Sequence, residues 1–149
     1  MPGASADDPH DLARFLEAQE DDYADALAEI EAGAKRTHWI WYVFPQLEGL
    51  GSSPRAHYFG LSGIEEAAAF LAHPVLGPRL LRIAEAALAH AGTPPERLMG
   101  SAVDAAKLRS SATLFARVPG APPVFDNLLE AFYDGRPCGR TLARLAESR

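Results

Sequence analysis

Apolar residues recur every three or four positions along most of the chain, which is the spacing of one face of an α-helix. Asp8-Pro9 is typical of a helix start and Gly33 of a helix end, so one long helix is expected between them. Asp21-Asp22 leaves open a division of this segment into two helices. The stripe that predicts the helix consists of Leu12, Phe15, Leu16, Gln19, Tyr23, Leu27 and Ile30.

Similar stripes, separated by turn residues, predict helices over 62–72, 78–90, 94–100, 101–118, 122–133 and 140–147. Capping boxes are expected at Ser62 and Thr93, and Ser101 is expected to open the next helix. The last helix is expected to direct Leu142 and Leu145 inward.

Alternating strand patterns are nearly absent, and "WIWYVF" (39–44) is the one segment with β propensity. A single strand has nothing to pair with, so we expect a short helix there, capped by Thr37 and ended by Pro45. The longest irregular connection is 45–61, although part of it is also compatible with the start of a helix. The pattern predicts an all-α protein: a disordered N-terminus at 1–7, then one compact domain, 8–149, with about seven helices.

Length and composition agree with this fold class. A chain of 149 residues is long enough for one sizeable core, and its apolar runs are far shorter than the ~20 residues that span a bilayer. No signal-peptide pattern is present, and Cys138, the one cysteine, cannot form an internal disulfide, so we expect a cytoplasmic protein. No metal-ligand spacing or cofactor motif is found, so neither a metal nor a cofactor is expected.

The distribution of charge bears on the partner. A net charge of -6 argues against nucleic acid. Residues 7–31 hold ten acids against one cation, Arg14, while the rest of the chain has thirteen cations against ten acids. A small anion can therefore still find a positive pocket.

The first candidate site is "KRTHWIWYVFPQL", residues 35–47. A tryptophan, Trp39 or Trp41, is suited to stack a planar ring. Lys35 is suited to bind a phosphate or carboxylate, and His38, whose unperturbed pKa is near neutral, to act as general acid or base. Gln46, at the edge of the apolar block, either caps a backbone group or faces a ligand. The alternative is that the aromatic residues are core and that Lys35 and its neighbour cap the preceding helix.

The second candidate site is "DAAKLRSSATLF", residues 104–115. Asp104, Lys107 and Ser111 share one helical face, and hydroxyl residues are unusual inside a helix. A phosphate or sugar would use them together with the cations, so the candidate ligand-binding residues are Lys107, Arg109, Ser110, Ser111 and Thr113. The alternative is an Asp104–Lys107 ion pair with hydroxyls bonded to the preceding turn.

Two further polar residues are expected to be structural. Gln19 interrupts the apolar stripe of the first helix, and a buried glutamine must have its hydrogen bonds made. Tyr23 lies one turn further along the same helix. Both Lys35 and Lys107, which are the chain's two lysines, fall in the two candidate stretches.

The order of these motifs, "FLEAQ", then "K..HWIWYVFPQL.GLG.S", "HPVLG.RL" and "KLRSSATLF", resembles the domain-of-unknown-function 1810 family, some of whose members carry a calpastatin-like label. The resemblance spans about residues 11–145 and implies a compact all-α fold. Ala112 departs from it, since the family usually carries methionine there. Calpain inhibition is not supported, because inhibitors of that kind are disordered. The resemblance implies these signature positions: Gln19, Tyr23, Lys35, His38, Trp39, Trp41, Phe44, Pro45, Gln46, Gly51, Ser53, His73, Gly77, Lys107, Ser110, Ser111 and Thr113.

A shorter segment, Asp104-x-x-Lys107 leading to Phe115, is similar to part of the helical NADAR family, which acts on ADP-ribose-type conjugates. Together these observations suggest a small helical domain that binds, with or without acting on, a phosphorylated or nucleotide-like molecule derived from ADP-ribose or NAD. The alternative is a non-enzymatic protein-interaction module whose signature residues are structural.

Overall fold

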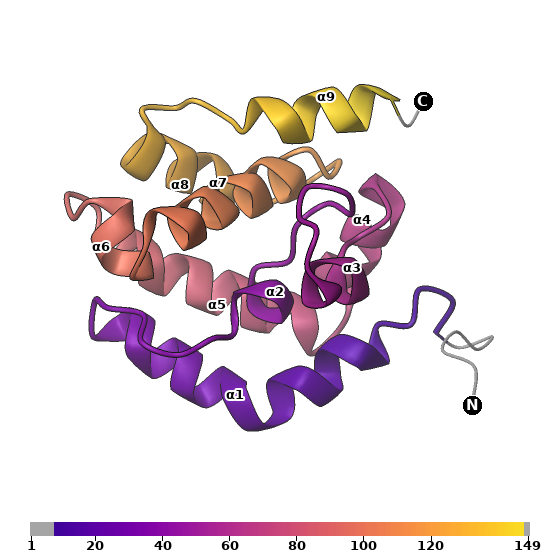
Figure 1. Ribbon diagram of the computed structural model, residues 1–149, viewed down its shortest axis with the longest axis horizontal. Coiled ribbons are helices and arrows are strands. Elements are labelled where there is room, and N and C mark those ends of the chain that lie inside the picture. The colour runs from indigo at the N-terminus through magenta and orange to yellow at the C-terminus, as the bar shows by residue number, and fades with distance from the viewer. Residues whose placement is uncertain (1–7, 148–149) are drawn as a thin grey trace.

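The computed structural model describes residues 8–147, in which nine helices and no strand are found (Figure 1). The expected all-α fold is confirmed. The predicted disordered segment 1–7 lies outside the described residues. The helices are α1 (Ala13–Glu31), α2 (Ile40–Val43), α3 (Pro54–Phe59), α4 (Ile64–Ala72), α5 (Leu76–Leu88), α6 (Pro95–Met99), α7 (Ala102–Ala116), α8 (Val124–Tyr133) and α9 (Gly139–Glu147).

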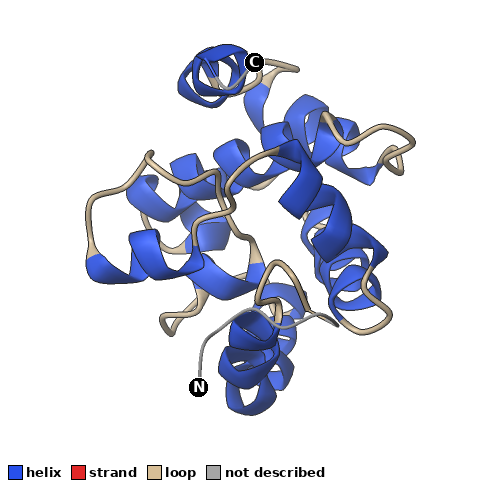
Figure 2. Ribbon diagram, turned by 90° about the vertical axis from the view of Figure 1, so that its right-hand side faces the viewer, coloured by secondary structure: helices blue, strands red, loops and turns tan. Residues whose placement is uncertain are grey.

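Two helices organise the bundle. Helix α5 packs against α1, α4 and α8, while α7 packs against α4, α6, α8 and α9. The short helix α2 lies between these two groups of helices, because it contacts α1, α3 and α7. Figure 2 shows the described chain as helices joined by loops. Segments 35–47 and 104–115 are therefore neighbours in space.

A column of aromatic rings runs through the core. Phe15 packs on Phe59 with ring centroids 5.6 Å apart and edge-on to Phe70 at 5.0 Å. Phe70 continues to Phe115 at 5.6 Å, and Phe115 to Phe125 at 5.4 Å. These separations are favourable for aromatic pairs. The column joins α3, α1, α4, α7 and α8 into one core.

A buried ion pair fastens α1 to α4. Arg14 donates to Glu66 at 2.8 Å, and the two side chains are 9% and 6% exposed. The same guanidinium donates to the carbonyls of Tyr58, Gly60 and two residues of the preceding turn. A buried charge is tolerated when its hydrogen bonds are made, so Arg14 has a structural role.

Glu29 holds the segment that precedes α2. Its carboxylate accepts the N–H groups of Arg36 at 2.8 Å and Thr37 at 3.0 Å, the indole N–H of Trp39 at 2.9 Å, and the Thr37 hydroxyl at 2.6 Å. Burial alone would raise the pKa of Glu29, but these hydrogen bonds outweigh it and lower the pKa to about 2. The expected Thr37 cap of α2 is wrong, because its hydroxyl is bound to Glu29 instead.

The start of α1 differs from the prediction. The helix begins at Ala13, four residues after Pro9, because Asp11 adopts a left-handed conformation (φ 51°) that interrupts the turn. Asp8 nevertheless caps it from a distance, since its carboxylate accepts the N–H groups of Leu12 at 2.7 Å and Ala13 at 2.9 Å. The helix continues through residues 21–22, so the single-helix alternative holds.

Of the caps expected at Ser62, Thr93 and Ser101, one is confirmed. Ser101 accepts the N–H of Asp104 at 3.0 Å at the start of α7. The capping box at Ser62 is wrong, because Gly63 occupies the N-cap and the Ser62 N–H donates to Glu66 at 2.8 Å. Thr93 does not cap α6, whose N-cap is Pro94.

The connection 45–61 contains a helix, α3, that the apolar pattern did not predict. Ser53 caps it by accepting the N–H of Ala56 at 3.1 Å, and Pro54 is its first residue. The ends of the connection are joined where Leu61 donates to the Gln46 carbonyl at 2.9 Å and accepts from Glu48 at 2.7 Å. This closed loop brings α3 beside α2.

Candidate functional site

The two lysines meet at one carboxylate. The Nζ of Lys35 lies 2.7 Å from Oδ2 of Asp104, and the Nζ of Lys107 lies 3.9 Å from Oδ1. Lys35 is held further by a 2.6 Å hydrogen bond to the Thr37 carbonyl, and its side chain is only 4% exposed. Lys35 is therefore the main partner of Asp104. Lys107 pairs with Asp104 only weakly, and its side chain, which is 22% exposed, is accessible to another anion.

Two cations lie over the indole ring of Trp41. The Nζ of Lys107 and the Cζ of Arg55 are each 4.9 Å from a ring centroid of Trp41. Arg55 comes from α3 and Lys107 from α7, so Trp41 of α2 connects them. Cation–π contacts of this kind contribute about 0.5–2 kcal/mol each, depending on solvent exposure. We refer to Lys35, Trp41, Arg55, Asp104 and Lys107 as the Trp41 cluster.

The Trp41 cluster carries excess positive charge. It has three cations and one carboxylate, and no ion pair of Arg55 is found among residues 8–147. A further acid, Asp22, accepts a hydrogen bond from the hydroxyl of Tyr42, the residue that follows Trp41. Burial, followed by this contact with Asp22, raises the pKa of Tyr42, and the charge of Arg55 opposes the increase. Even with Asp22 included, one cation remains unbalanced in a chain whose net charge is -6.

Two buried polar atoms in this region lack hydrogen-bond partners. They are Trp41 Nε1 and the Ser111 hydroxyl, and no other such side-chain atoms are found in the described part of the chain. Ser111 lies one turn beyond Lys107 on the same face of α7 and is 1% exposed. Beside Trp41 and Gln46 there is a void of about 10 Å³, which is near the smallest volume that admits one water molecule.

His38 does not occupy a catalytic environment. Its side chain is exposed, and its ring has no hydrogen-bond partner among residues 8–147. Its carbonyl oxygen is used instead, accepting from the Tyr42 hydroxyl at 3.3 Å. A general base requires an orienting partner and a defined position, and His38 has neither in this structure.

Four of the predicted ligand-binding residues have internal roles. Trp39 is 1% exposed and its indole donates to Glu29, so it cannot stack on a ligand. Ser110 bonds to the Thr141 hydroxyl at 2.9 Å. Thr113 donates to the Arg109 carbonyl and accepts from the Cys138 N–H, both at 2.8 Å. The guanidinium of Arg109 donates to the Arg136 carbonyl at 2.8 Å, on the side of α7 that faces the C-terminal segment.

The two residues predicted to be structural make hydrogen bonds between helices. Gln19 is 2% exposed, donates to the Tyr42 carbonyl at 2.6 Å and accepts from Arg79 at 3.3 Å. The Tyr23 hydroxyl donates to the Arg79 carbonyl at 2.7 Å. These bonds fix α1 against α2 and α5, and so set the position of Trp41.

Arg55 is the residue of the Trp41 cluster that sequence analysis did not identify. It lies on α3, the helix that the apolar pattern did not predict. Its only sequence signal is the Ser53-Pro54 start of α3. The described residues include no group of three or more His, Cys, Asp or Glu side chains that could hold a metal ion. In the same residues, no helix is long and apolar enough to cross a membrane.

Comparisons with known proteins place the chain in a family. No curated protein matches it. It is similar to the conserved hypothetical protein Rv1873 from Mycobacterium tuberculosis, whose crystal structure was determined at 1.38 Å, with 47% identity and a TM-score of 0.89 over 93% of this chain and 99% of that one. A family model described as "Protein of unknown function (DUF1810)" matches residues 9–145. The chain therefore belongs to the DUF1810 family.

Proposed function

We propose that this protein binds a small anionic molecule, of phosphorylated or nucleotide-like type, at the Trp41 cluster. The observation that supports the proposal is the pair of cations, Arg55 and Lys107, gathered over one indole ring with too few carboxylates to balance them. An oxyanion between these two side chains would receive charge-assisted hydrogen bonds from both. Gln46 lines a small cavity together with Trp41, the residue that both cations contact.

The proposal is of binding and not of catalysis. No group in the Trp41 cluster is arranged as an acid–base pair, and His38 lacks an orienting partner among the described residues. We also place the protein in the cytoplasm, where its free Cys138 would stay reduced. Inorganic phosphate, AMP and ADP-ribose are the ligands to test, because they share a phosphate and differ in the remainder.

Binding is tested by titrating each ligand while following tryptophan fluorescence and heat. Trp39 is enclosed in the core, so a fluorescence change should arise from Trp41 and disappear in Trp41→Phe. Removing one charge-assisted hydrogen bond costs about 1.5–3 kcal/mol, so Lys107→Ala and Arg55→Ala should each weaken binding by roughly tenfold or more. Arg97→Ala is the control, since Arg97 is an exposed arginine of α6 outside the cluster.

Two outcomes would contradict the proposal. One is that none of the three ligands binds more tightly than millimolar. The other is that Arg97→Ala weakens binding as much as Lys107→Ala, which would mean general electrostatic attraction. Failure of all ligands would leave the interaction module as the remaining hypothesis.

A further inference from the structure

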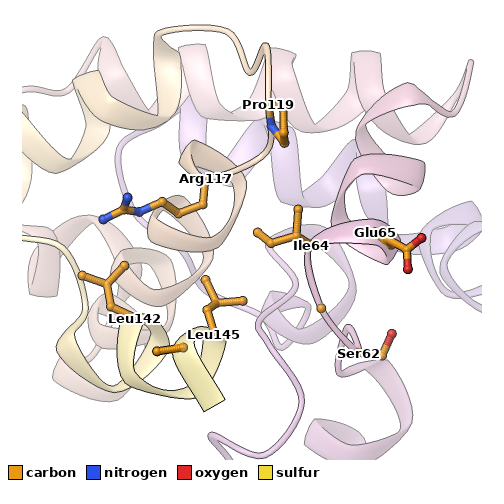
Figure 3. A pocket seen from close by; sticks show the side chains of 9 residues that line it. Ser62, Ile64, Glu65, Arg117, Pro119, Leu142 and Leu145 are labelled. Atoms are coloured by element: carbon orange, nitrogen blue, oxygen red, sulfur yellow. The ribbon is translucent and has the colours of Figure 1, made fainter. Parts of the chain in front are cut away.

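A groove of about 830 Å³ lies between the start of α4, the end of α7 and α9, away from the Trp41 cluster (Figure 3). Its volume is within the range of small-molecule sites. None of the residues proposed above lines it. Figure 3 shows Ile64, Leu142, Leu145 and Pro119 around the same space.

The apolar surface of the groove results from how α9 is attached. Leu142 and Leu145, which were expected to point inward, are both half-buried, and Leu145 packs against the core. The residue that enters the interior is Thr141, which is 0% exposed and bonds to Ser110 at 2.9 Å. Anchoring α9 through Thr141 leaves its two leucines half-buried along the groove, where Leu145 also packs against the edge of the core.

The groove has a charged residue at one end. Arg117, at the C-cap of α7, extends over the end where Leu142 lies (Figure 3). Its guanidinium has no carboxylate or hydrogen-bond partner among residues 8–147. The one lining acid, Glu65, points away from the leucines (Figure 3). Glu65 and Glu66 offset the positive end of the α4 dipole, so the start of α4 does not attract an anion. Arg117 is therefore the group in the groove that would bind one.

We propose that the groove between α4, α7 and α9 is a second binding site, which takes a small amphipathic carboxylate. The aliphatic part of the ligand would cover Ile64, Leu142 and Leu145, and its carboxylate would pair with Arg117. Burial of apolar surface would supply most of the affinity, at about 25 cal/mol per Å². The exposed ion pair would add little and would select an anion over a neutral analogue.

The test uses octanoate, with octanol as the uncharged analogue of the same length. Methyl NMR should show saturable shifts of Ile64, Leu142 and Leu145 with octanoate. Arg117→Gln should weaken the binding of octanoate by up to roughly fivefold, as expected for the loss of an exposed ion pair, and should leave the affinity for octanol unchanged. Arg97→Gln is the control. Leu145→Asn should weaken the binding of both ligands. The helical circular dichroism signal of this variant shows whether α9 remains folded.

Several results would overturn the inference. These are an absence of saturable shifts at the three methyl groups, or equal weakening of octanoate by Arg117→Gln and Arg97→Gln. A third is a shift of the same methyl groups with protein concentration alone, which would assign the groove to a second copy of the chain. AMP should not displace octanoate, because the two proposed sites share no residue.

Discussion

Two adjacent serines of α7 allow a sharp test of the buried polar groups. Ser110 and Ser111 are both buried, at 2% and 1% exposure, and belong to the same helix. The Ser110 hydroxyl bonds to Thr141, whereas the Ser111 hydroxyl has no partner among the described residues. Replacing each by alanine removes the same oxygen atom from two different environments. The gain in helix propensity from serine to alanine is common to both and cancels in the comparison.

The two variants should change stability in opposite directions. Ser110→Ala removes a hydrogen bond and part of the bonding of Thr141, so it should lower the free energy of unfolding by about 1–2 kcal/mol. Ser111→Ala removes a buried unsatisfied hydroxyl, which costs about 1–3 kcal/mol when left unpaired, less a small term for the space it vacates. We expect a gain of about 1 kcal/mol, and thus a difference of about 2–3 kcal/mol between the variants.

Urea unfolding followed by circular dichroism measures this difference as a change in midpoint at constant slope. In thermal unfolding, each kcal/mol corresponds to roughly 2–4 °C for a chain of this size. If Ser111→Ala loses as much stability as Ser110→Ala, then the Ser111 hydroxyl has a partner and the reasoning fails. If Ser111→Ala is stabilising, the hydroxyl is retained at a cost to the fold, which is the behaviour of residues kept for function.

The remaining predictions concern the segment before α2 and the contact between α4 and α5. Glu29→Gln should destabilise the protein near neutral pH, because hydrogen bonds lower the pKa of Glu29 from 4.5 to about 2 in the folded state. The stability that ionised Glu29 contributes is complete above pH 4.5 and is lost as the pH falls toward 2. Urea unfolding curves over a pH series measure this change, and Glu31→Gln, the control, should not show it. Gly77→Ala should cost about 3 kcal/mol or more in the same assay, since a Cβ at Gly77 would lie 2.1 Å from the Leu71 carbonyl oxygen, whereas Gly63→Ala, with nothing within 4 Å, should be close to neutral.

Helices with a clear stripe and a clear cap were predictable from local pattern. Ser101 caps α7 as expected, and α8 follows Pro122-Pro123. The start of α1 was not predictable, because the left-handed Asp11 shifts the cap provided by Asp8. Helix α3 was missed since six residues are too short to show a period, and its stability comes from packing against α2.

The candidate site was predictable only in part. Periodicity placed Lys107 and Ser111 on one face of α7, and Lys107 contacts the ring of Trp41. The roles of Ser110 and Ser111 could not be separated, because adjacent helix positions differ by ~100° and only the docking of α9 decides which hydroxyl finds a partner. Glu29 looked like one more acid in an acidic helix, and its four hydrogen bonds depend on a chain reversal that periodicity does not encode.

The charge balance of the Trp41 cluster favours the proposed ligand site over a purely structural network. A network that only held helices together would need Lys35 and Asp104, whose pairing at 2.7 Å is complete by itself. Arg55 and Lys107 each contact the same indole ring without a carboxylate of their own to balance them, so an anion bound there would lower the repulsion between the cations of the cluster. The chain has more acidic than basic residues, but many of the acids are exposed on the outer face of α1. An anion that binds the native state should therefore stabilise the protein, by about 2.7 kcal/mol at a hundred times its Kd, and this gain should be smaller in Lys107→Ala.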